Sequence, residues 1–392
     1  MYKTCLFLLS FISLYSISKS QSIQVIEYDM DTKQIDTINI DINTNKPDEK
    51  TSFFVGHLNN TIANLNENTP TEHLAEGSLY TLKFLADEHY TTSDFPIRTS
   101  VRLNHISKDS LQSFCSGSLV GPNLVLTAAH CISSSFGSEF NFFEGNYFAT
   151  PIYNNGSVSN QLYGGRVSKI LIPIIDQKIY DIAMLVLDDP IGISAGWLGI
   201  GYQEQDEILL SHIYYKFSYP AKSNFLGNGI LYNGDTLFFN YGKLDYISER
   251  HIGVNYGKGI PGESGSSLFS VKFNKDYTSY GVFSIHAKYS HTRITKPIYL
   301  AFKHYIQRIE LPVKNEGFLF FPNPVTNNLF LYSVSKSKFN SINILNLQGK
   351  LMFTSKTYND QNGFNLDFLS TGIYLIECKI NGESFVKKMI KL

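Results

Sequence analysis

The chain has 392 residues, a length that usually holds two or three domains. Hydrophobic residues make up 43% of it and aromatic residues 14%, which is enough for a packed core and favours β structure over helical bundles. The formal net charge of −1 gives no sign of a nucleic-acid partner, so we expect none.

The first 20 residues have the pattern of a signal peptide. Lys3 precedes an apolar run from Cys5 to Ile17, and the small residues near Ser18 and Ser20 fit a cleavage site. A single-pass membrane anchor is the alternative, but the run is too short to cross a bilayer comfortably. We therefore expect export, and no stable membrane span after the peptide is removed.

Residues 21–78 are polar, with short apolar pieces between them. This segment is either a removable pro-segment or a permanent N-terminal extension, and the sequence favours neither. From residue 79 to 312, short alternating runs separated by Gly, Asn and Ser predict many β-strands, beginning near 96–103. Residues 299–309 have apolar residues at helical spacing and predict a helix that closes this region.

One histidine lies in a distinctive stretch inside this β region. Residues 114–120 (Phe-Cys-Ser-Gly-Ser-Leu-Val) and 126–131 (Leu-Thr-Ala-Ala-His-Cys) read as two strands joined by a turn. The run resembles the histidine region of chymotrypsin-like serine proteases, which implies that His130 is a general base. The resemblance also implies a disulfide between Cys115 and Cys131, which the predicted hairpin would bring together. The alternative for His130 is an ordinary buried histidine.

Two further motifs follow in the order His, Asp, Ser that this family uses. Residues 180–187 (Tyr-Asp-Ile-Ala-Met-Leu-Val-Leu) resemble the family's aspartate strand, which implies that Asp181 orients His130. Ser264 lies in a Gly-Glu-Ser-Gly stretch that resembles the nucleophile loop, and the N–H groups of Gly262 and Ser264 would form an oxyanion hole. The order excludes the α/β-hydrolase elbow, in which the serine comes first.

The nucleophile stretch departs from the trypsin pattern at two positions. Glu263 stands where the trypsin branch has an aspartate that receives the newly cut N-terminal amine, so the resemblance does not carry that activation route over to this chain. Ser266 instead resembles the bacterial glutamyl endopeptidase branch, as do residues 196–199 (Gly-Trp-Leu-Gly) and 219–220 (Tyr-Pro). The resemblance therefore leans towards that branch.

Substrate specificity depends on residues 280–287 (Tyr-Gly-Val-Phe-Ser-Ile-His-Ala). Matched to trypsin, this stretch places Ser284 against the buried aspartate and His286 in the first substrate pocket. Matched to the glutamyl branch, it makes His286 the residue that binds an acidic side chain before the scissile bond. The partner threonine of that branch is Gly259 here, so half of the acid-binding pair is missing. An acidic preference is a hypothesis, and an ordinary strand histidine is its alternative.

Residues 317–392 form a separate unit. Pro-Asn-Pro at 322–324, Ile-Leu-Asn-Leu-Gln-Gly-Lys at 344–350 and Thr-Gly-Ile-Tyr at 371–374 resemble, in this order, the type A C-terminal sorting domain of the type IX secretion system. The resemblance implies that the type IX machinery exports the protein through the periplasm and outer membrane. Alternating strands bounded by turns predict a small antiparallel β-sandwich. An appended adhesion or carbohydrate-binding module is the alternative.

The predicted fold class is all-β: a chymotrypsin-like double β-barrel with a C-terminal helix at 79–312, then the sorting sandwich at 317–392. Cys378 is left without a disulfide partner, and its alternating surroundings predict a buried, inert thiol.

The predicted function is that of a secreted serine endopeptidase that cleaves proteins or peptides through His130, Asp181 and Ser264. Such a site needs no metal or cofactor, and no acidic loop has the spacing of a calcium site. Two alternatives remain: a catalytically inactive binding or adhesion module with the protease fold, and an esterase of non-peptide substrates.

Overall fold

The computed structural model describes residues 23–40, 49–56, 61–68, 83–110, 112–136, 140–156, 164–221, 232–254, 259–272, 276–284, 290–308, 317–321, 323, 325, 328–333, 338–357 and 363–392. The predicted signal peptide at 1–20 and His286 lie outside these residues.

The first sheet closes into a barrel of six strands. Their order is β12-β6-β5-β4-β9-β10, and β10 pairs back onto β12. The strands are β4 (Ser100–Ile106), β5 (Gln112–Gly121), β6 (Leu124–Thr127), β9 (Asn146–Pro151), β10 (Gly165–Ile175) and β12 (Ala183–Leu187). Alternate residues point inward along each strand, so Val101, Leu103, Leu119, Val125, Ile170 and Leu185 fill one continuous core.

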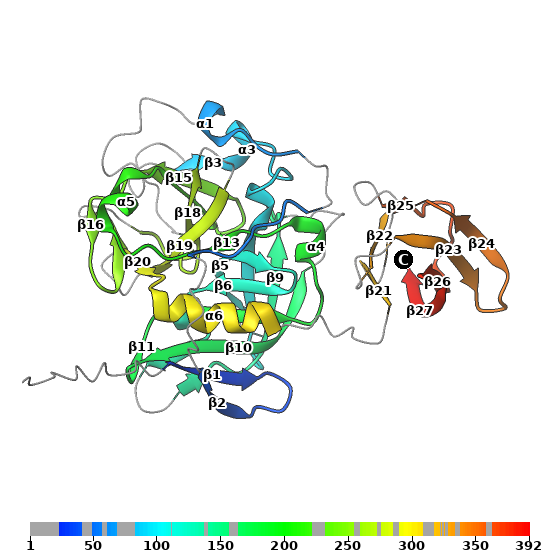
Figure 1. The fold of residues 1–392 in the computed structure, drawn as a ribbon, viewed down its shortest axis with the longest axis horizontal. Helices are drawn as coiled ribbons and strands as arrows, with labels where there is room; N and C mark the ends of the chain where they lie inside the picture. The colour runs from blue at the N-terminus through cyan, green and yellow to red at the C-terminus, as the bar shows by residue number, and fades with distance from the viewer. Residues whose placement is uncertain are drawn as a thin grey trace, which may run out of the picture.

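Part of the N-terminal segment joins this sheet. β1 (Ile23–Asp29) pairs antiparallel with β10 along its whole length, and β2 (Ile35–Ile40) pairs with β1. Figure 1 shows this hairpin beside β10, below the barrel. Further along, the Thr51 N–H donates to the Ile200 carbonyl at 2.9 Å, and the Ile200 N–H donates to the Thr51 hydroxyl at 2.9 Å. The described parts of this segment are therefore packed against strands of both large sheets.

The second sheet has the order β16-β17-β20-β19-β18-β14-β15-β3, with β13 added parallel to β19. Its strands are β3 (Phe84–Leu85), β13 (Gly199–Ile200), β14 (Tyr214–Ser218), β15 (Phe238–Gly242), β16 (Tyr246–Ile247), β17 (His251–Gly253), β18 (Ser267–Lys272), β19 (Asp276–Ser284) and β20 (Ser290–Arg293). Aromatic side chains from three of these strands stack on one another in its core, among them Phe217, Phe239 and Phe269.

Helix α6 (Lys296–Arg308) follows β20 and lies beside β10 and β1 (Figure 1). Pro297 fits its first turn, where a missing N–H is harmless. Ile298, Tyr299 and Phe302 are buried, which is the helical spacing that the sequence predicts. The shorter elements are α1 (Leu65–Asn68), α3 (Ala86–His89), η2 (Ile97–Thr99), η3 (Ala129–Cys131), β7 (Ser133–Phe136), β8 (Phe140–Phe142), β11 (Lys178–Ile179), α4 (Gly192–Ala195) and α5 (Asp206–Ser211).

The C-terminal unit consists of two small antiparallel sheets. One has the order β21-β22-β25, formed by β21 (Phe318–Phe321), β22 (Asn328–Ser333) and β25 (Phe364–Asn365). The other has the order β24-β23-β26-β27, formed by β23 (Phe339–Asn346), β24 (Leu351–Ser355), β26 (Gly372–Ile380) and β27 (Glu383–Lys391). Leu329, Leu331, Ile344, Ile376 and Met389 pack together between them. The predicted all-β fold class is confirmed.

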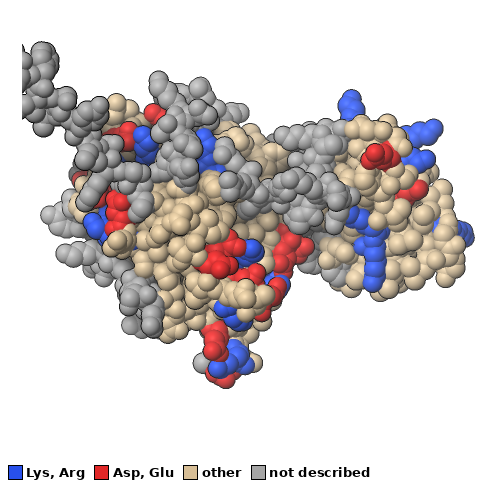
Figure 2. Space-filling view, turned by 60° about the horizontal axis from the view of Figure 1, so that its bottom comes forward, with Lys and Arg blue, Asp and Glu red and all other residues tan. Residues whose placement is uncertain are grey.

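Charged side chains differ between the two parts of the chain. Figure 2 shows mainly basic side chains on the C-terminal unit, whereas acidic and basic side chains are mixed on the larger part of the chain. In that larger part, Arg166 pairs with both Asp31 and Asp188. None of the helices in the described ranges is both long and apolar enough to span a membrane.

Candidate active site

The structure brings His130 and Asp181 together through the pairing of two barrel strands. His130 lies in η3, just after β6, and Asp181 lies just before β12, which pairs with β6. The Nδ1 atom of His130 is 2.7 Å from Asp181 Oδ2, and its backbone N–H donates to Oδ1 at 2.8 Å. The carboxylate therefore fixes both the ring and the backbone of the histidine.

Ser264 comes from the second sheet, in the loop before β18. Its Oγ is 2.8 Å from Nε2 of His130, the ring nitrogen opposite to the one that faces Asp181. The site thus lies where the two sheets meet. His130 and Asp181 keep side-chain exposures of only 15% and 13%, and Ser264 is buried. His130 is thus within hydrogen-bond distance of both other residues of the predicted constellation.

Asp181 is surrounded by hydrogen-bond donors. Ser284 donates its hydroxyl to Oδ2, and Thr292 donates its hydroxyl to the Asp181 backbone carbonyl at 3.0 Å. Burial alone would raise the pKa of Asp181, but the bonds from His130 and Ser284 hold that pKa below its ordinary value. Ser284 was expected from the sequence, whereas Thr292 lies in no local motif and was missed.

A disulfide joins Cys115 and Cys131, with their Cα atoms 6.2 Å apart, as the resemblance implied. It ties β5 to η3, which carries His130. These three residues also form the cluster of possible metal ligands found in the described parts of the chain. Because both sulfurs belong to the disulfide, neither is a thiolate that could bind a metal. Cys378 is buried, and burial raises the pKa of its thiol.

The loop around Ser264 depends on glycine at two positions. Gly262 and Gly265 both have φ of +88°, a left-handed conformation that other residues rarely adopt. A Cβ atom on Gly262 would lie 2.3 Å from the Tyr219 carbonyl oxygen, and one on Gly265 would lie 2.1 Å from that of Ser116. Both glycines are therefore required by backbone conformation and by space.

Hydrogen bonds leave two N–H groups of this loop available. Ser116 donates its backbone N–H to the Ser264 carbonyl at 2.8 Å and its hydroxyl to the Gly262 carbonyl at 2.7 Å. The N–H groups of Glu263, Gly265 and Ser266 also have acceptors. Within the described residues, by contrast, no protein acceptor is recorded for the N–H of Gly262 or Ser264. Those two donors are free to bind a developing oxyanion.

The sequence interpretation missed Ser116 as a support of this loop, although it lies between Cys115 and Gly117 in the motif already recognised. The expected substrate-binding His286 lies two residues beyond Ser284, outside the described residues. At Gly259 an added Cβ would lie 2.1 Å from the Phe283 ring. A threonine at that position would need Phe283 to move.

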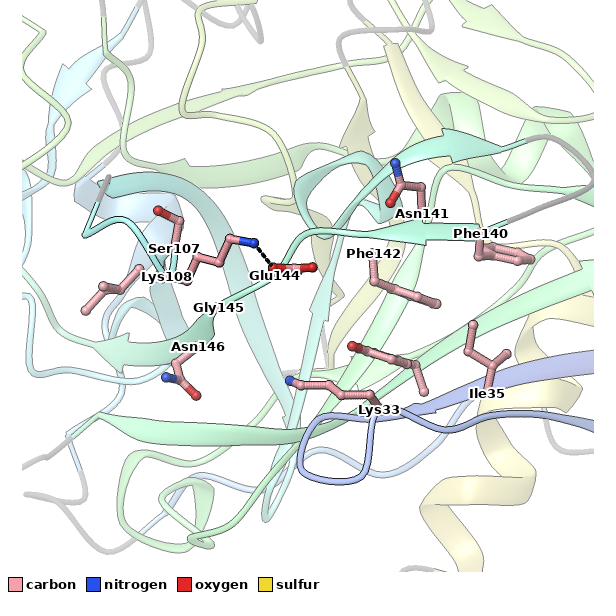
Figure 3. A pocket seen from close by; sticks show the side chains of 12 residues that line it. Lys33, Ile35, Ser107, Lys108, Phe140, Asn141, Phe142, Glu144, Gly145 and Asn146 are labelled. Carbon is pink, nitrogen blue, oxygen red and sulfur yellow. Dashed lines mark ion pairs between the residues drawn. The ribbon is translucent and has the colours of Figure 1, made fainter.

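A hollow lies away from His130, Asp181 and Ser264, beside the β1–β2 hairpin. It has a volume of about 720 Å³, and Tyr28, Lys33, Phe142 and Glu144 are among the residues that line it. Figure 3 shows the ion pair between Lys108 and Glu144 at this hollow, where the two charged groups are 2.6 Å apart. No residue of the triad lines it.

Comparisons with known proteins divide the chain into two matched regions. Residues 319–392 match the secretion system C-terminal sorting domain, and residues 88–301 match trypsin. Among solved structures, the chain is similar to the protease Anisep from Arthrobacter nicotinovorans, with a TM-score of 0.37 and 20% identity. That match covers 49% of this chain and 85% of the other. No curated protein matches the chain.

The two matched regions define the class and destination of the protein. The sorting domain indicates export by the type IX secretion system to the cell surface or the extracellular space. The protease domain indicates a hydrolase of the serine protease type, with peptides as substrates. Because the trypsin match covers more than half of the 392 residues, the chain belongs to the trypsin family.

Proposed function

We propose that the protein is a secreted serine endopeptidase whose catalytic residues are His130, Asp181 and Ser264. The observation that carries this proposal is the continuous line of hydrogen bonds through one imidazole. Its Nε2 lies 2.8 Å from Ser264 Oγ, and its Nδ1 lies 2.7 Å from Asp181 Oδ2. A neutral imidazole in this position donates its Nδ1–H to the carboxylate and accepts the serine proton on Nε2.

The reaction proceeds in two halves. Ser264 Oγ attacks the scissile carbonyl carbon while its proton moves to Nε2 of His130, and Asp181 stabilises the resulting imidazolium. The imidazolium then gives this proton to the leaving amine, which breaks the C–N bond and leaves an acyl group on Ser264. A water molecule, deprotonated by His130, hydrolyses that ester and restores the serine hydroxyl.

The N–H groups of Gly262 and Ser264 would stabilise the tetrahedral intermediate. Support for this role comes from the loop, in which the neighbouring N–H groups are used internally and these two are not. Donors of this kind act on the charge that appears on the carbonyl oxygen during attack. Loss of one such donor typically reduces kcat by about 100-fold or more.

A preference for Glu or Asp before the scissile bond is the more specific part of the proposal. It rests on the likeness to the glutamyl endopeptidase branch at Ser266 and on His286, which follows Ser284 by two residues. Ser284, the last described residue before His286, donates its hydroxyl to Asp181. The absence of a side chain at Gly259 argues for a pocket that differs from that of the branch.

The order of segments fits a protein processed during export. We propose a signal peptide at 1–20, a protease domain at 79–312 and a sorting domain at 317–392, with residues 21–78 between the first two. The match of 319–392 to the sorting domain supports the last of these boundaries.

A fluorophosphonate probe tests the proposed function, because it reacts with a serine activated by a neighbouring base. The purified wild-type protein should be labelled, and Ser264→Ala should not. Ser211→Ala is a matched control, because Ser211 is an exposed serine on α5. A properly processed wild type that takes up no label would favour the inactive binding module.

A panel of peptides that differ only in the residue before the scissile bond tests the reaction and its specificity. Faster cleavage after Glu or Asp than after Leu supports the acidic preference, and equal rates contradict it. Labelling by the probe without cleavage of any peptide would favour an esterase.

A further inference from the structure

Glu263, next to the nucleophile, is a fully buried carboxylate with two lysine partners. Its Oε1 lies 2.9 Å from Lys216 Nζ and 3.2 Å from Lys83 Nζ, and the Ser218 hydroxyl donates to the same oxygen at 3.3 Å. Its Oε2 accepts the Ile260 N–H at 2.6 Å. A carboxylate without exposed surface is strongly destabilising unless cations and hydrogen bonds replace its lost hydration, and here both do.

The bonds of Glu263 extend directly to the oxyanion loop. Its backbone N–H donates to the Ile260 carbonyl at 3.2 Å, so Ile260 is bonded to both its side chain and its backbone. Its backbone carbonyl accepts the N–H of Ser266 at 3.1 Å and the Ser266 hydroxyl at 2.7 Å. The peptide planes on both sides of Glu263 are held in this way, and the plane that follows Glu263 carries the N–H of Ser264. The N–H of Gly262 lies in the preceding plane, whose Pro261 carbonyl accepts the Ala221 N–H at 2.6 Å.

The two lysines reach this cluster from different parts of the chain. Lys216 is in the middle of β14, has no exposed side-chain surface and lies 4.3 Å from the centre of the Phe283 ring. Lys83 directly precedes β3, which pairs with β15 and lies beside it in Figure 1. Sheet pairing therefore holds Lys83 in place, although it lies N-terminal to the residues that match trypsin.

The charges in this cluster leave no role for a third cation. Within the described residues, both ammonium groups face the carboxylate of Glu263. A newly cut N-terminal amine would bring a third positive charge to a carboxylate that two cations already pair with. Glu263 is thus fully neutralised by side chains of the folded protein.

We propose that Lys83 and Lys216 are the permanent counter-ions of Glu263 and position the oxyanion loop. The enzyme is then competent without a cut that creates a new N-terminus, and Lys83 stays with the mature protein. This inference rests on the proposed function, because it concerns the regulation of the same site. The packing of β1 on β10 agrees with it. Removal of β1 would uncover Ile175 and Pro173, the buried β10 residues that pair with Ile23 and Val25.

The pH dependence of Lys216 provides a specific signature. Burial lowers its pKa to about 8, against the attraction of Glu263, and repulsion from Lys83 adds to the lowering. Of the other groups near the cluster, His291 is buried with a pKa well below its ordinary value, and burial raises the pKa of Tyr232. In the wild type, deprotonation of Lys216 above pH 8 still leaves Lys83 to pair with Glu263.

Without Lys83, deprotonation of Lys216 would leave Glu263 with no counter-ion. We therefore expect Lys83→Met to show an alkaline decline in kcat that the wild type lacks. Because the variant also loses the repulsion from Lys83, the pKa of Lys216 rises, and the decline lies above pH 8. A merely structural role for Lys83 would not produce this change in the pH profile.

The experiment compares full-length, exported variants that have the wild-type melting temperature. At neutral pH, Lys83→Met should lower kcat by about tenfold with little change in KM, as expected for a weakened charged hydrogen bond. The double variant with Lys216→Met should lower it by about 100-fold or more, as for loss of an oxyanion donor. Lys83→Arg keeps the positive charge, so its kcat should lie within about threefold of the wild-type value. Lys33→Met replaces a lysine outside the cluster and should leave kcat unchanged.

The outcomes separate this inference from the proposed function. If the wild type takes up no fluorophosphonate, the proposed function itself is wrong. If the wild type is labelled and a folded double variant has its full kcat, only the inference is wrong. If the double variant does not fold, the alkaline decline of Lys83→Met decides. Mass spectrometry of the labelled wild type should find Lys83 in the active species, and an active species that starts after Lys83 would overturn the inference.

Discussion

Asp181 and Glu263 are two carboxylates of the same candidate site, and they are neutralised in different ways. Asp181 pairs with one imidazole and keeps 13% of its side chain exposed. Glu263 pairs with two ammonium groups and is not exposed at all. The imidazole of a catalytic histidine gains and loses a proton in each cycle, whereas the ammonium groups beside Glu263 are paired with it inside a closed cluster.

The difference matches the roles that we propose for the two halves of the site, one around Asp181 and His130 and the other around Glu263. In the proposed mechanism the Asp181 half responds to proton transfer, and the disulfide between Cys115 and Cys131 anchors its backbone covalently. The Glu263 half has to keep the backbone donors of the loop still, and buried ion pairs serve that purpose. The comparison teaches that one active site can use similar carboxylates for proton transfer and for positioning.

The largest effect is expected at the nucleophile that both halves serve. Ser264→Ala should lower kcat/KM by about 10⁶-fold, since loss of a triad serine removes the covalent route entirely. Steady-state hydrolysis of a peptide measures this, with Ser211→Ala as the unchanged control. A Ser264→Ala variant that keeps a tenth of the activity would contradict the assignment of both halves.

The Asp181 half is probed by Asp181→Asn. This change leaves the shape of the side chain but favours the wrong tautomer of His130, so kcat should fall by about 10⁴-fold. A kcat within tenfold of the wild type would show that Asp181 does not orient His130.

The Glu263 half is probed by Glu263→Gln, which leaves two lysines without a counter-charge. We expect kcat to fall by about 100-fold through the oxyanion donors, a smaller loss than for Asp181→Asn. The acidic limb of the kcat/KM profile should stay as in the wild type. A shift of that limb would mean that both carboxylates act on the His130 imidazole, and the distinction between them would disappear.

The covalent anchor of the Asp181 half is tested by replacing both Cys115 and Cys131 with alanine. The double variant should lose about 3 kcal/mol of unfolding free energy, the usual value for a closed loop of this size. Denaturant unfolding measures it. Cys378→Ala removes a buried thiol but no crosslink, so it is the matched control and should lose less.

The smallest effect is expected in the acid stability of the wild type. The pKa values of Asp181 and Glu263 are both below their ordinary values, so protons bind more tightly to the unfolded chain. Their stabilisation is complete above about pH 4.5 and is lost as the pH falls through the folded values. Unfolding measured from pH 6 to pH 2 should show this loss, and Glu263→Gln should make the curve flatter.

The residues of the candidate site could be predicted from the sequence because each of them lies in its own short motif with a fixed neighbourhood. Asp181 precedes an apolar strand, and His130 and Ser264 lie beside cysteine or glycine residues that the local geometry requires. The fold class followed from many short alternating runs. These signals are local, so one sequence was enough to recognise them.

The support of the site could not be predicted in the same way. Lys83 and Lys216 are strand or strand-edge lysines far from Glu263 in the chain, and only sheet pairing brings them together. A lysine at the centre of the apolar run at 214–218 (Tyr-Tyr-Lys-Phe-Ser) was the one available signal. The β1–β2 hairpin was missed for a related reason, because its alternation between Ile23 and Ile40 is short and depends on β10 as a partner.

The most direct test of the account is to map the covalent adduct of the fluorophosphonate probe by mass spectrometry. The wild-type protein should carry one adduct, on Ser264, and His130→Ala should lower its rate of formation by several orders of magnitude. An adduct on another serine, or no adduct on a folded and processed wild-type protein, would contradict the central claim that His130, Asp181 and Ser264 form the catalytic site.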